Sequence, residues 1–128
     1  MTKKNNETFR VAVYGTLLAG ERNEHWAAGA LSRVPCVIWG VLYDTGCGFP
    51  AFVPASPTEG HAVQAELLTV DADGLAMMDE LEGYPRLYRR DDILAVLRDG
   101  TAVPAMVYVM NRLPPRATVI ASGDWRNR

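Results

Sequence analysis

The stretch of sequence that decides the fold is residues 77–85, Met-Met-Asp-Glu-Leu-Glu-Gly-Tyr-Pro. Leu75, Met78 and Leu81 recur at the spacing of one face of an α-helix. The Gly-Tyr-Pro sequence at the end of the stretch contains two residues that stop helices. These residues therefore predict a helix whose last turn holds Glu82.

Glu82 occupies an unusual position for an acidic residue. It follows Met78 and Leu75 by four and seven residues, so it shares the apolar side of the predicted helix. The apolar surroundings, the helix macrodipole and repulsion from Asp79 would each raise the pKa of its carboxyl, as in a general base tuned towards neutrality. The same residues also fit a simpler interpretation, in which Asp79, Glu80 and Glu82 form a solvated, frayed helix end.

The composition is that of one ordinary globular domain. The chain has 128 residues, 48% of them hydrophobic and 22% charged, which is enough to bury a single core. We expect one domain over residues 1–128, with the polar residues 1–7 disordered. The net charge of −2 and the lack of a Lys/Arg stripe argue against a nucleic-acid partner. No feature of the sequence points to an oligomeric state.

The sequence carries no targeting or metal-binding signal that we recognise. Because no apolar segment follows the first basic residues, we expect neither a signal peptide nor a membrane span, and we expect a cytoplasmic location. In that compartment Cys36, in a predicted strand, and Cys47, in a predicted loop, are expected to be free thiols, although their pairing stays open. His25 and His61 lie far apart and near no cysteine pair, so no metal site is predicted.

The N-terminal part of the chain begins with a strand that leads into a glycine-containing turn. Apolar residues alternate with Arg and Ala over residues 9–13, which predicts a strand. It runs directly into Tyr14, Gly15, Thr16 and Leu17. The glycine allows a sharp turn and a close approach by a ligand, and successive N–H groups in such a turn form an anion-binding concavity. The alternative is an ordinary strand exit with a packed tyrosine.

A second helix is expected after this turn. Residues 24–31 have the composition of a short helix, and Asn23 is a candidate N-cap. Trp26 and Leu31 are expected to pack in the core. For the predicted helix that ends at Glu82, the candidate N-cap is an aspartate, Asp71 or Asp73 in the sequence.

The middle of the chain predicts strands separated by loops. The apolar run over 36–43 favours a buried strand, with Gly40 marking a bulge or a close approach. Residues 45–51 and 54–60 predict irregular loops, of which the first either lines a pocket or is a plain connection. Alternation over 63–67 predicts a half-exposed strand.

The C-terminal part predicts a hairpin and a tail. Residues 93–97 and 102–110 read as strands joined by a tight Asp-Gly turn, with Pro104 indicating an edge position or a bulge. The tail is expected to be mostly irregular and to dock through Asp124 and Trp125. Five or six strands with one clear helix and one doubtful helix predict an α+β domain, a small mixed or partly closed β-barrel with one or two flanking helices.

Several segments resemble the signature motifs of the γ-glutamylcyclotransferase-like family. They are residues 14–17 (YGTL), residues 78–83 (MDELEG) followed by Tyr88 and Arg89, residues 105–109 (AMVYV) and residues 123–125 (GDW). They span nearly the whole chain in the expected order, and the similarity is greatest to the AIG2-like, γ-glutamylamine cyclotransferase branch. The pair YGTL and DELEG in so short a chain is fairly specific.

The resemblance implies a fold and an activity. It implies a small barrel with a cavity at its mouth, Glu82 as catalytic acid/base and residues 14–17 as the loop that holds the glutamyl group of a small γ-glutamyl substrate. In the family reaction the α-amine of a γ-glutamyl group attacks its own γ-carbonyl, which releases 5-oxoproline and a free amine or amino acid. No cofactor is expected to be needed for this reaction.

The residues suit that chemistry. Holding one molecule in an attack-ready shape supplies roughly 7–11 kcal/mol of a barrier, and one tuned carboxylate acting as base and then acid adds roughly 10²–10⁴-fold. The N–H groups of Gly15, Thr16 and Leu17 are candidates for binding the substrate carboxylate or the oxyanion. Tyr88 and Tyr108 are candidate pocket residues, with core packing as the alternative. No Ser/His/Asp or Cys/His pattern supports a covalent nucleophile.

Two other functions remain open from the sequence. Residues 18–25 are expected to shape the leaving-group side of the pocket, so the released amine is undetermined. The first alternative is a non-catalytic small-molecule binding module of the same fold, against which an intact Glu82 argues. The second is a tailoring enzyme that removes a γ-glutamyl group from a larger metabolite. An interaction domain that works through its sheet edge or tail has no positive support.

Overall fold

The computed structural model describes residues 7–128. Apart from Glu7, which is exposed and precedes the first strand, the segment predicted to be disordered lies outside the described residues. The elements in chain order are β1 (Thr8–Val13), η1 (Glu24–Ala27), β2 (Ser32–Asp44), β3 (Pro50–Pro54), β4 (His61–Asp71), α1 (Ala72–Glu82), β5 (Tyr88–Leu97), β6 (Ala102–Met110), β7 (Thr118–Val119) and η2 (Trp125–Asn127). The two η elements are short 3₁₀-helices.

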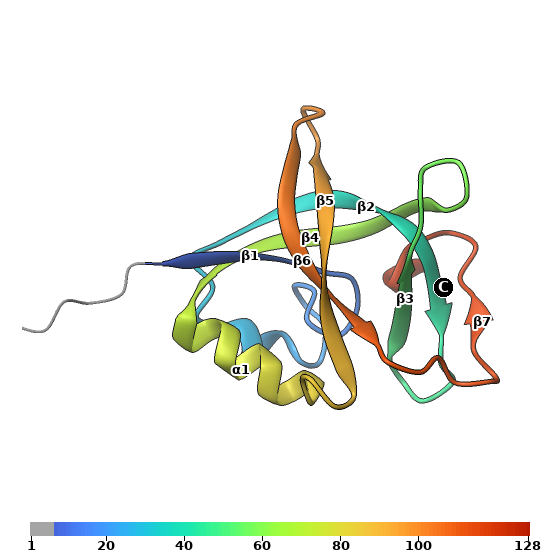
Figure 1. The fold of residues 1–128 in the computed structure, drawn as a ribbon, viewed down its shortest axis with the longest axis horizontal. Coiled ribbons are helices and arrows are strands. Elements are labelled where there is room, and N and C mark those ends of the chain that lie inside the picture. The colour runs from blue at the N-terminus through green and yellow to red at the C-terminus, as the bar shows by residue number, and fades with distance from the viewer. Residues whose placement is uncertain (1–6) are drawn as a thin grey trace, which may run out of the picture.

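Five strands close into a barrel in the order β2, β4, β1, β6, β5, with β5 returning to pair with β2. β3 and β7 are added to β2 outside this ring, and Figure 1 shows them on the right, beside the C-terminal tail. The sheet is mixed, because β1 pairs antiparallel with β4 and parallel with β6. The predicted mixed, partly closed barrel with flanking helices is confirmed.

The contact between β1 and β6 is short. It consists of two residue pairs, Val11 with Met106 and Ala12 with Val107. Pro104, two residues earlier in β6, pairs with β5 but has no partner in β1. The predicted edge-like position of Pro104 is therefore confirmed. This position suits a proline, because a proline has no N–H to donate to a second neighbouring strand.

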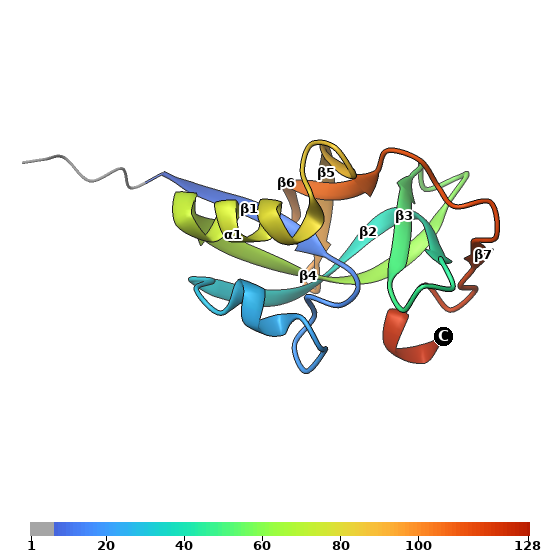
Figure 2. The same ribbon diagram turned by 90° about the horizontal axis from the view of Figure 1, so that it is seen from below.

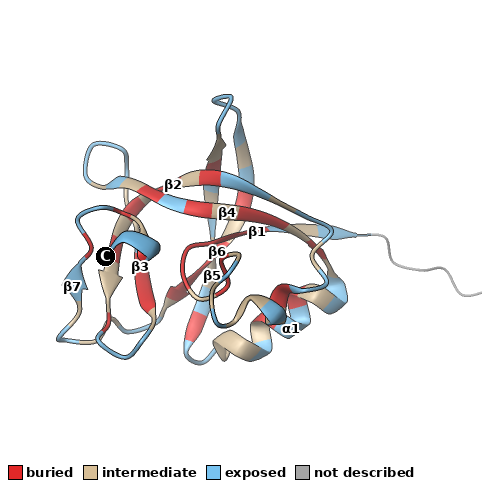
Figure 3. Ribbon diagram, turned by 180° about the vertical axis from the view of Figure 1, so that it is seen from behind, coloured by how far each residue is buried: buried red, intermediate tan, exposed pale blue. Residues whose placement is uncertain are grey.

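Helix α1 is capped at both ends by residues next to it in the sequence. The Asp71 carboxylate accepts a hydrogen bond from Gly74 N at 2.8 Å, which caps the helix start. Gly83 ends the helix in a left-handed conformation at φ 66°. Leu75 and Met78 face the barrel and are buried. Figure 2 shows α1 running alongside β1, and Figure 3 shows that its outer face is exposed. Helix α1 therefore delivers the residue at its end to one end of the barrel.

The predicted length of the second helix is wrong. Residues 24–31 form only the single 3₁₀ turn η1, after which Leu31 N donates to a β4 carbonyl and the chain joins the sheet. Asn23 does not cap η1; its side chain donates a hydrogen bond to Thr16 Oγ1. Leu31 is 61% exposed rather than buried, whereas Trp26 packs partly buried against the core.

The strands are longer than the sequence predicts, and β3 was missed. β2 continues through Pro35, which lies opposite Glu66 of β4. The sequence predicts loops over 45–51 and 54–60 and no element between them, whereas β3 pairs with β2 over five residue pairs. The predicted close approach at Gly40 is confirmed, because a Cβ there would lie 2.4 Å from Val53 O. Pairing with a neighbouring strand, which local patterns do not reveal, sets these boundaries.

The tail docks as predicted. Trp125 is buried, and the guanidinium of Arg128 lies 3.5 Å from its ring centroid. Gln64 N donates to Gly123 O at 2.7 Å, which ties the tail to β4. The Asp124 side chain accepts a hydrogen bond from the backbone of η2.

Cys36 is buried in β2 and Cys47 is exposed in the loop before β3, and both are free thiols. Over residues 7–128 there is no group of three or more His, Cys, Asp or Glu side chains placed to hold a metal ion. In the same part of the chain no helix is long and apolar enough to cross a membrane. The predicted cytoplasmic location stays a prediction.

Candidate active site

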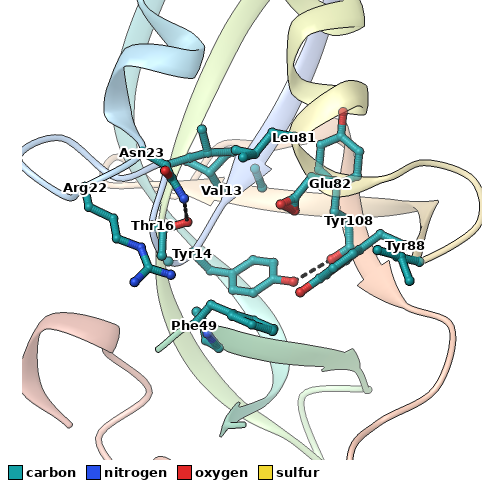
Figure 4. A pocket seen from close by; sticks show the side chains of 15 residues that line it. Val13, Tyr14, Thr16, Arg22, Asn23, Phe49, Leu81, Glu82, Tyr88 and Tyr108 are labelled. Atoms are coloured by element: carbon teal, nitrogen blue, oxygen red, sulfur yellow. Dashed lines mark hydrogen bonds between the residues drawn. The ribbon is translucent and has the colours of Figure 1, made fainter. Parts of the chain in front are cut away.

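A pocket of about 270 Å³ opens where β1 ends, between the following turn, the start of β3 and the end of α1. Its walls, drawn in Figure 4, come from six separate stretches of the chain. The lining residues are Ala12, Val13, Tyr14, Gly15, Thr16, Leu17, Arg22, Asn23, Phe49, Pro50, Leu81, Glu82, Leu87, Tyr88 and Tyr108. All seven residues predicted as site residues therefore line one pocket. Their catalytic and binding roles stay predictions.

The turn after β1 presents free backbone donors. Leu18 N donates to Gly15 O at 3.0 Å, which closes the turn, and Arg33 holds Leu17 O at 3.0 Å. Within the described residues, the N–H groups of Gly15, Thr16 and Leu17 donate no hydrogen bond. Three unpaired N–H groups at the wall of a pocket can bind an anion or a developing oxyanion.

Gly15 is required by the closeness of the opposite wall. A Cβ on this residue would lie 2.4 Å from Pro50 Cγ and 2.7 Å from Pro50 Cδ. Pro50 is the first residue of β3, the strand that the sequence did not predict. The start of β3 therefore forms the pocket wall that faces the turn. Any larger residue at position 15 would displace the turn or the proline ring.

Glu82 is the last residue of α1, and its carboxylate points into the pocket (Figure 4). The Glu82 carboxylate forms no hydrogen bond or ion pair with any residue in the described part of the chain. Burial raises the pKa of this carboxyl from 4.5 to about 7. Glu82 is therefore a carboxyl that can both accept and donate a proton near neutral pH, which is the property of a general acid/base.

The predicted contribution of Asp79 to this pKa is wrong. Burial is the cause that raises the pKa of Glu82. Asp79 lies one turn back but is engaged elsewhere, since it accepts a hydrogen bond from Tyr108 Oη at 2.6 Å. Arg90 Nε lies 3.7 Å from the same carboxylate oxygen and balances its charge. Asp79 thus fixes the Tyr108 ring as a wall of the pocket, with the hydroxyl turned towards α1 (Figure 4).

Three tyrosines surround Glu82. Tyr14 Oη donates to the backbone carbonyl of Tyr108 at 2.7 Å, a bond that links the end of β1 to β6. Burial raises the pKa of Tyr14, Tyr88 and Tyr108, and the negative charge of Glu82 raises each further. All three are neutral phenols at physiological pH and serve as walls or donors, which leaves Glu82 as the acid/base of the pocket.

Sequence reasoning missed the residues of the opposite side, Arg22, Asn23, Phe49 and Pro50. The sequence predicts that the segment 18–25 shapes the leaving-group side and that the segment 45–51 either lines a pocket or is a plain connection, but it identifies no pocket residue within them. Asn23 is held against the turn at Thr16, because its side chain donates to Thr16 Oγ1 and its backbone N donates to Thr16 O at 2.9 Å. Only the folded position of the loop before β3 shows which side chains reach the pocket.

A small barrel that holds an unpaired carboxyl opposite a turn of free N–H groups has the parts of an enzyme that transfers protons. The family model described as gamma-glutamyl cyclotransferase, AIG2-like, matches residues 11–127. The chain therefore belongs to the AIG2-like γ-glutamyl cyclotransferase family. The sequence-based recognition of this family is confirmed.

Individual relatives agree with this membership. A provisionally named γ-glutamylcyclotransferase of Drosophila melanogaster is 30% identical over 129 residues, covering 91% of this chain and 78% of its own. The γ-glutamylaminecyclotransferase A of Danio rerio is 31% identical over 128 residues, covering 92% and 74%. The crystal structure of an AIG2-like protein from Mus musculus matches with a TM-score of 0.72 at 23% identity over 86% of this chain and 82% of that one. This last similarity shows the fold.

Proposed function

We propose that the protein is a γ-glutamyl cyclotransferase that converts a γ-glutamyl amine or amino acid into 5-oxoproline and the free amine. The observation that carries the proposal is Glu82: an unpaired carboxyl, with a pKa raised to about 7, that faces a pocket of substrate size. Burying an acid without a partner costs stability. A proton-transfer role gives a reason for that cost.

The proposed reaction begins with the substrate α-ammonium beside the Glu82 carboxylate. Glu82 takes one proton, and the freed amine attacks the γ-carbonyl carbon of the same molecule. A C–N bond forms, and the carbonyl oxygen becomes an oxyanion. When the oxyanion collapses, the original amide C–N bond breaks and Glu82 returns its proton to the leaving nitrogen, while the second proton of the ring nitrogen passes to the same leaving amine. The products are the neutral lactam and an ammonium ion. Atoms and charges balance, and Glu82 ends as it began.

The turn after β1 supports the same reaction. The unpaired N–H groups of Gly15, Thr16 and Leu17 suit either the substrate α-carboxylate or the oxyanion. Holding the α-carboxylate there would fold the glutamyl chain so that its amine approaches its γ-carbonyl, which is the entropic part of catalysis. The reaction is redox-neutral: one C–N bond forms, another breaks, and the protein transfers only protons, so the proposed mechanism needs no cofactor.

The test is release of 5-oxoproline from a panel of γ-glutamyl compounds. The panel comprises γ-glutamyl-ε-lysine, γ-glutamyl dipeptides, glutathione and simple γ-glutamylamines, each run with the wild type and with Glu82→Gln. We expect release by the wild type and a loss of at least about 10²-fold in the variant. No release from any compound, combined with measurable binding, would favour a binding module. A Gln variant with a near-normal rate would remove Glu82 from the mechanism.

A further inference from the structure

Arg22 is a pocket residue that the proposed reaction does not use. Among the residues that line the pocket, it is the only cation and Glu82 is the only anion. Figure 4 shows the two on opposite sides, with Tyr14 and Thr16 between them in the view. The Arg22 guanidinium lies over the loop before β3, where a Cβ on Gly48 would be 3.1 Å from Nη1. This arrangement places a positive charge at the mouth, away from the acid/base.

The Arg22 side chain has no ion pair or hydrogen bond within the described residues. The acidic side chains of its own loop, Glu21 and Glu24, and that of Glu66 in β4 are engaged elsewhere. Glu21 pairs with Arg126 at 4.0 Å, and the Glu24 carboxylate accepts a hydrogen bond from the backbone of its own loop. Glu66 is held by Arg33 and by the tail. A cation left free at a pocket rim, while its acidic neighbours are paired, is available to an anionic ligand.

The pocket thus has two separate groups with the charge or the free donors to bind an anion. One is the set of free N–H groups of the turn after β1, and the other is Arg22. A γ-glutamyl amine has one carboxylate, that of the glutamyl group. A γ-glutamyl amino acid has two, because the leaving amine carries its own carboxylate.

We propose that Arg22 is a specificity residue that binds a carboxylate of the leaving amine, so that the preferred substrates are γ-glutamyl amino acids rather than neutral γ-glutamylamines. The inference rests on the proposed cyclotransferase function. In this arrangement the turn binds the glutamyl carboxylate, the reacting atoms lie at Glu82 and the leaving group extends to the mouth. Arg22 acts on binding and takes no part in proton transfer.

A matched pair of substrates tests this. γ-Glutamylalanine and γ-glutamylethylamine differ only in the carboxylate of the leaving group. The wild type is expected to favour γ-glutamylalanine by about tenfold in kcat/KM, the lower end for a charged hydrogen bond because Arg22 is exposed. Arg22→Met is expected to remove most of this preference through KM, and Arg22→Lys to keep part of it. Arg98→Met, at the exposed β5–β6 turn outside the pocket, is the matched control and is expected to keep the full preference.

The outcomes separate the inference from the proposed function. If Arg22→Met slowed both substrates equally, Arg22 would bind the glutamyl carboxylate that they share, and the inference would be overturned. The inference would also be overturned if the wild type showed no preference between γ-glutamylalanine and γ-glutamylethylamine. If the wild type released 5-oxoproline from neither compound nor from any other of the panel, the proposed function itself would fail, and this inference with it.

Discussion

Replacing Glu82 by Gln is expected to stabilise the protein while it removes the activity. Gln has nearly the same shape as Glu but carries no charge at any pH. The wild-type carboxyl has a pKa of about 7 in the folded state against an ordinary value of 4.5, because burial disfavours its charged form. The charged form of Glu82 therefore lowers the free energy of unfolding of the wild type at neutral pH, and the Gln variant has no such charge.

The sign and size of the effect follow from proton linkage. Between pH 4.5 and about 7 the folded state binds more protons at Glu82 than the unfolded state does, so the free energy of unfolding falls as pH rises. Below pH 4.5 both states are protonated and the cost vanishes. Above pH 7 it is complete, and the difference between the two pKa values corresponds to about 3 kcal/mol. At about 2.1 cal/mol/K per residue, this is a rise of roughly 10 °C in Tm for the chain of 128 residues.

The assay is urea unfolding of the wild type and Glu82→Gln at pH 4.5, 6, 7 and 8, with 5-oxoproline release measured on the same samples. The difference in the free energy of unfolding is expected to grow from near zero at pH 4.5 to its full value at pH 8. Glu80→Gln is the matched control, because Glu80 is an exposed acid on the same helix. It is expected to change neither stability nor rate appreciably.

Two results would refute this reasoning. Equal stabilities of the wild type and Glu82→Gln at pH 8 would mean that the carboxyl is not desolvated. A constant difference at all four pH values would mean that the substitution acts through packing rather than through charge. A stabilised variant that kept its turnover would retain the burial argument and remove the catalytic one.

Three further outcomes are expected. Asp79→Asn keeps an oxygen that can accept a hydrogen bond from the Tyr108 hydroxyl, so kcat/KM should fall less than about tenfold. This loss is far smaller than the loss expected for Glu82→Gln. A larger loss in steady-state assays would show that the ion pair with Arg90 matters. Gly15→Ala should destabilise the protein by about 1–3 kcal/mol in thermal unfolding and disable the turn, since its Cβ meets Pro50; an unaltered variant would contradict the close packing. The rate of 5-oxoproline release should rise with pH through an inflection near 7, because the proposed base must be ionised to take a proton, whereas a flat profile between pH 5 and 9 would exclude this.

The parts of the fold that sequence predicts are those specified by neighbouring residues. The end of α1 at Gly83 and its start at Asp71 depend on capping within one turn. The hairpin between β5 and β6 depends on Asp99 and Gly100, the latter at φ 89°. Glu82 could be singled out for the same reason, because its apolar side of the helix is visible from residue spacing.

The missed parts depend on residues distant in sequence. β3 is a short strand with proline at both ends, and it exists because β2 supplies its hydrogen-bond partners. Asp79 was misjudged because its partner, Tyr108, lies 29 residues further along the chain. Arg22 reaches the pocket only because the loop at Gly48 passes under its side chain. No local pattern carries these three contacts.

The short pairing of β1 with β6 has a consequence for the order of events during folding. Tyr14 and Tyr108, which join the ends of these strands through a side-chain hydrogen bond, are 94 residues apart in sequence. Bringing such distant segments together costs chain entropy before any contact repays it, so this seam is expected to form late. A chain with its helix and hairpins in place but the seam open would have no pocket. Recovery of turnover during refolding would therefore lag behind recovery of the helical signal and would report on the closing of the barrel.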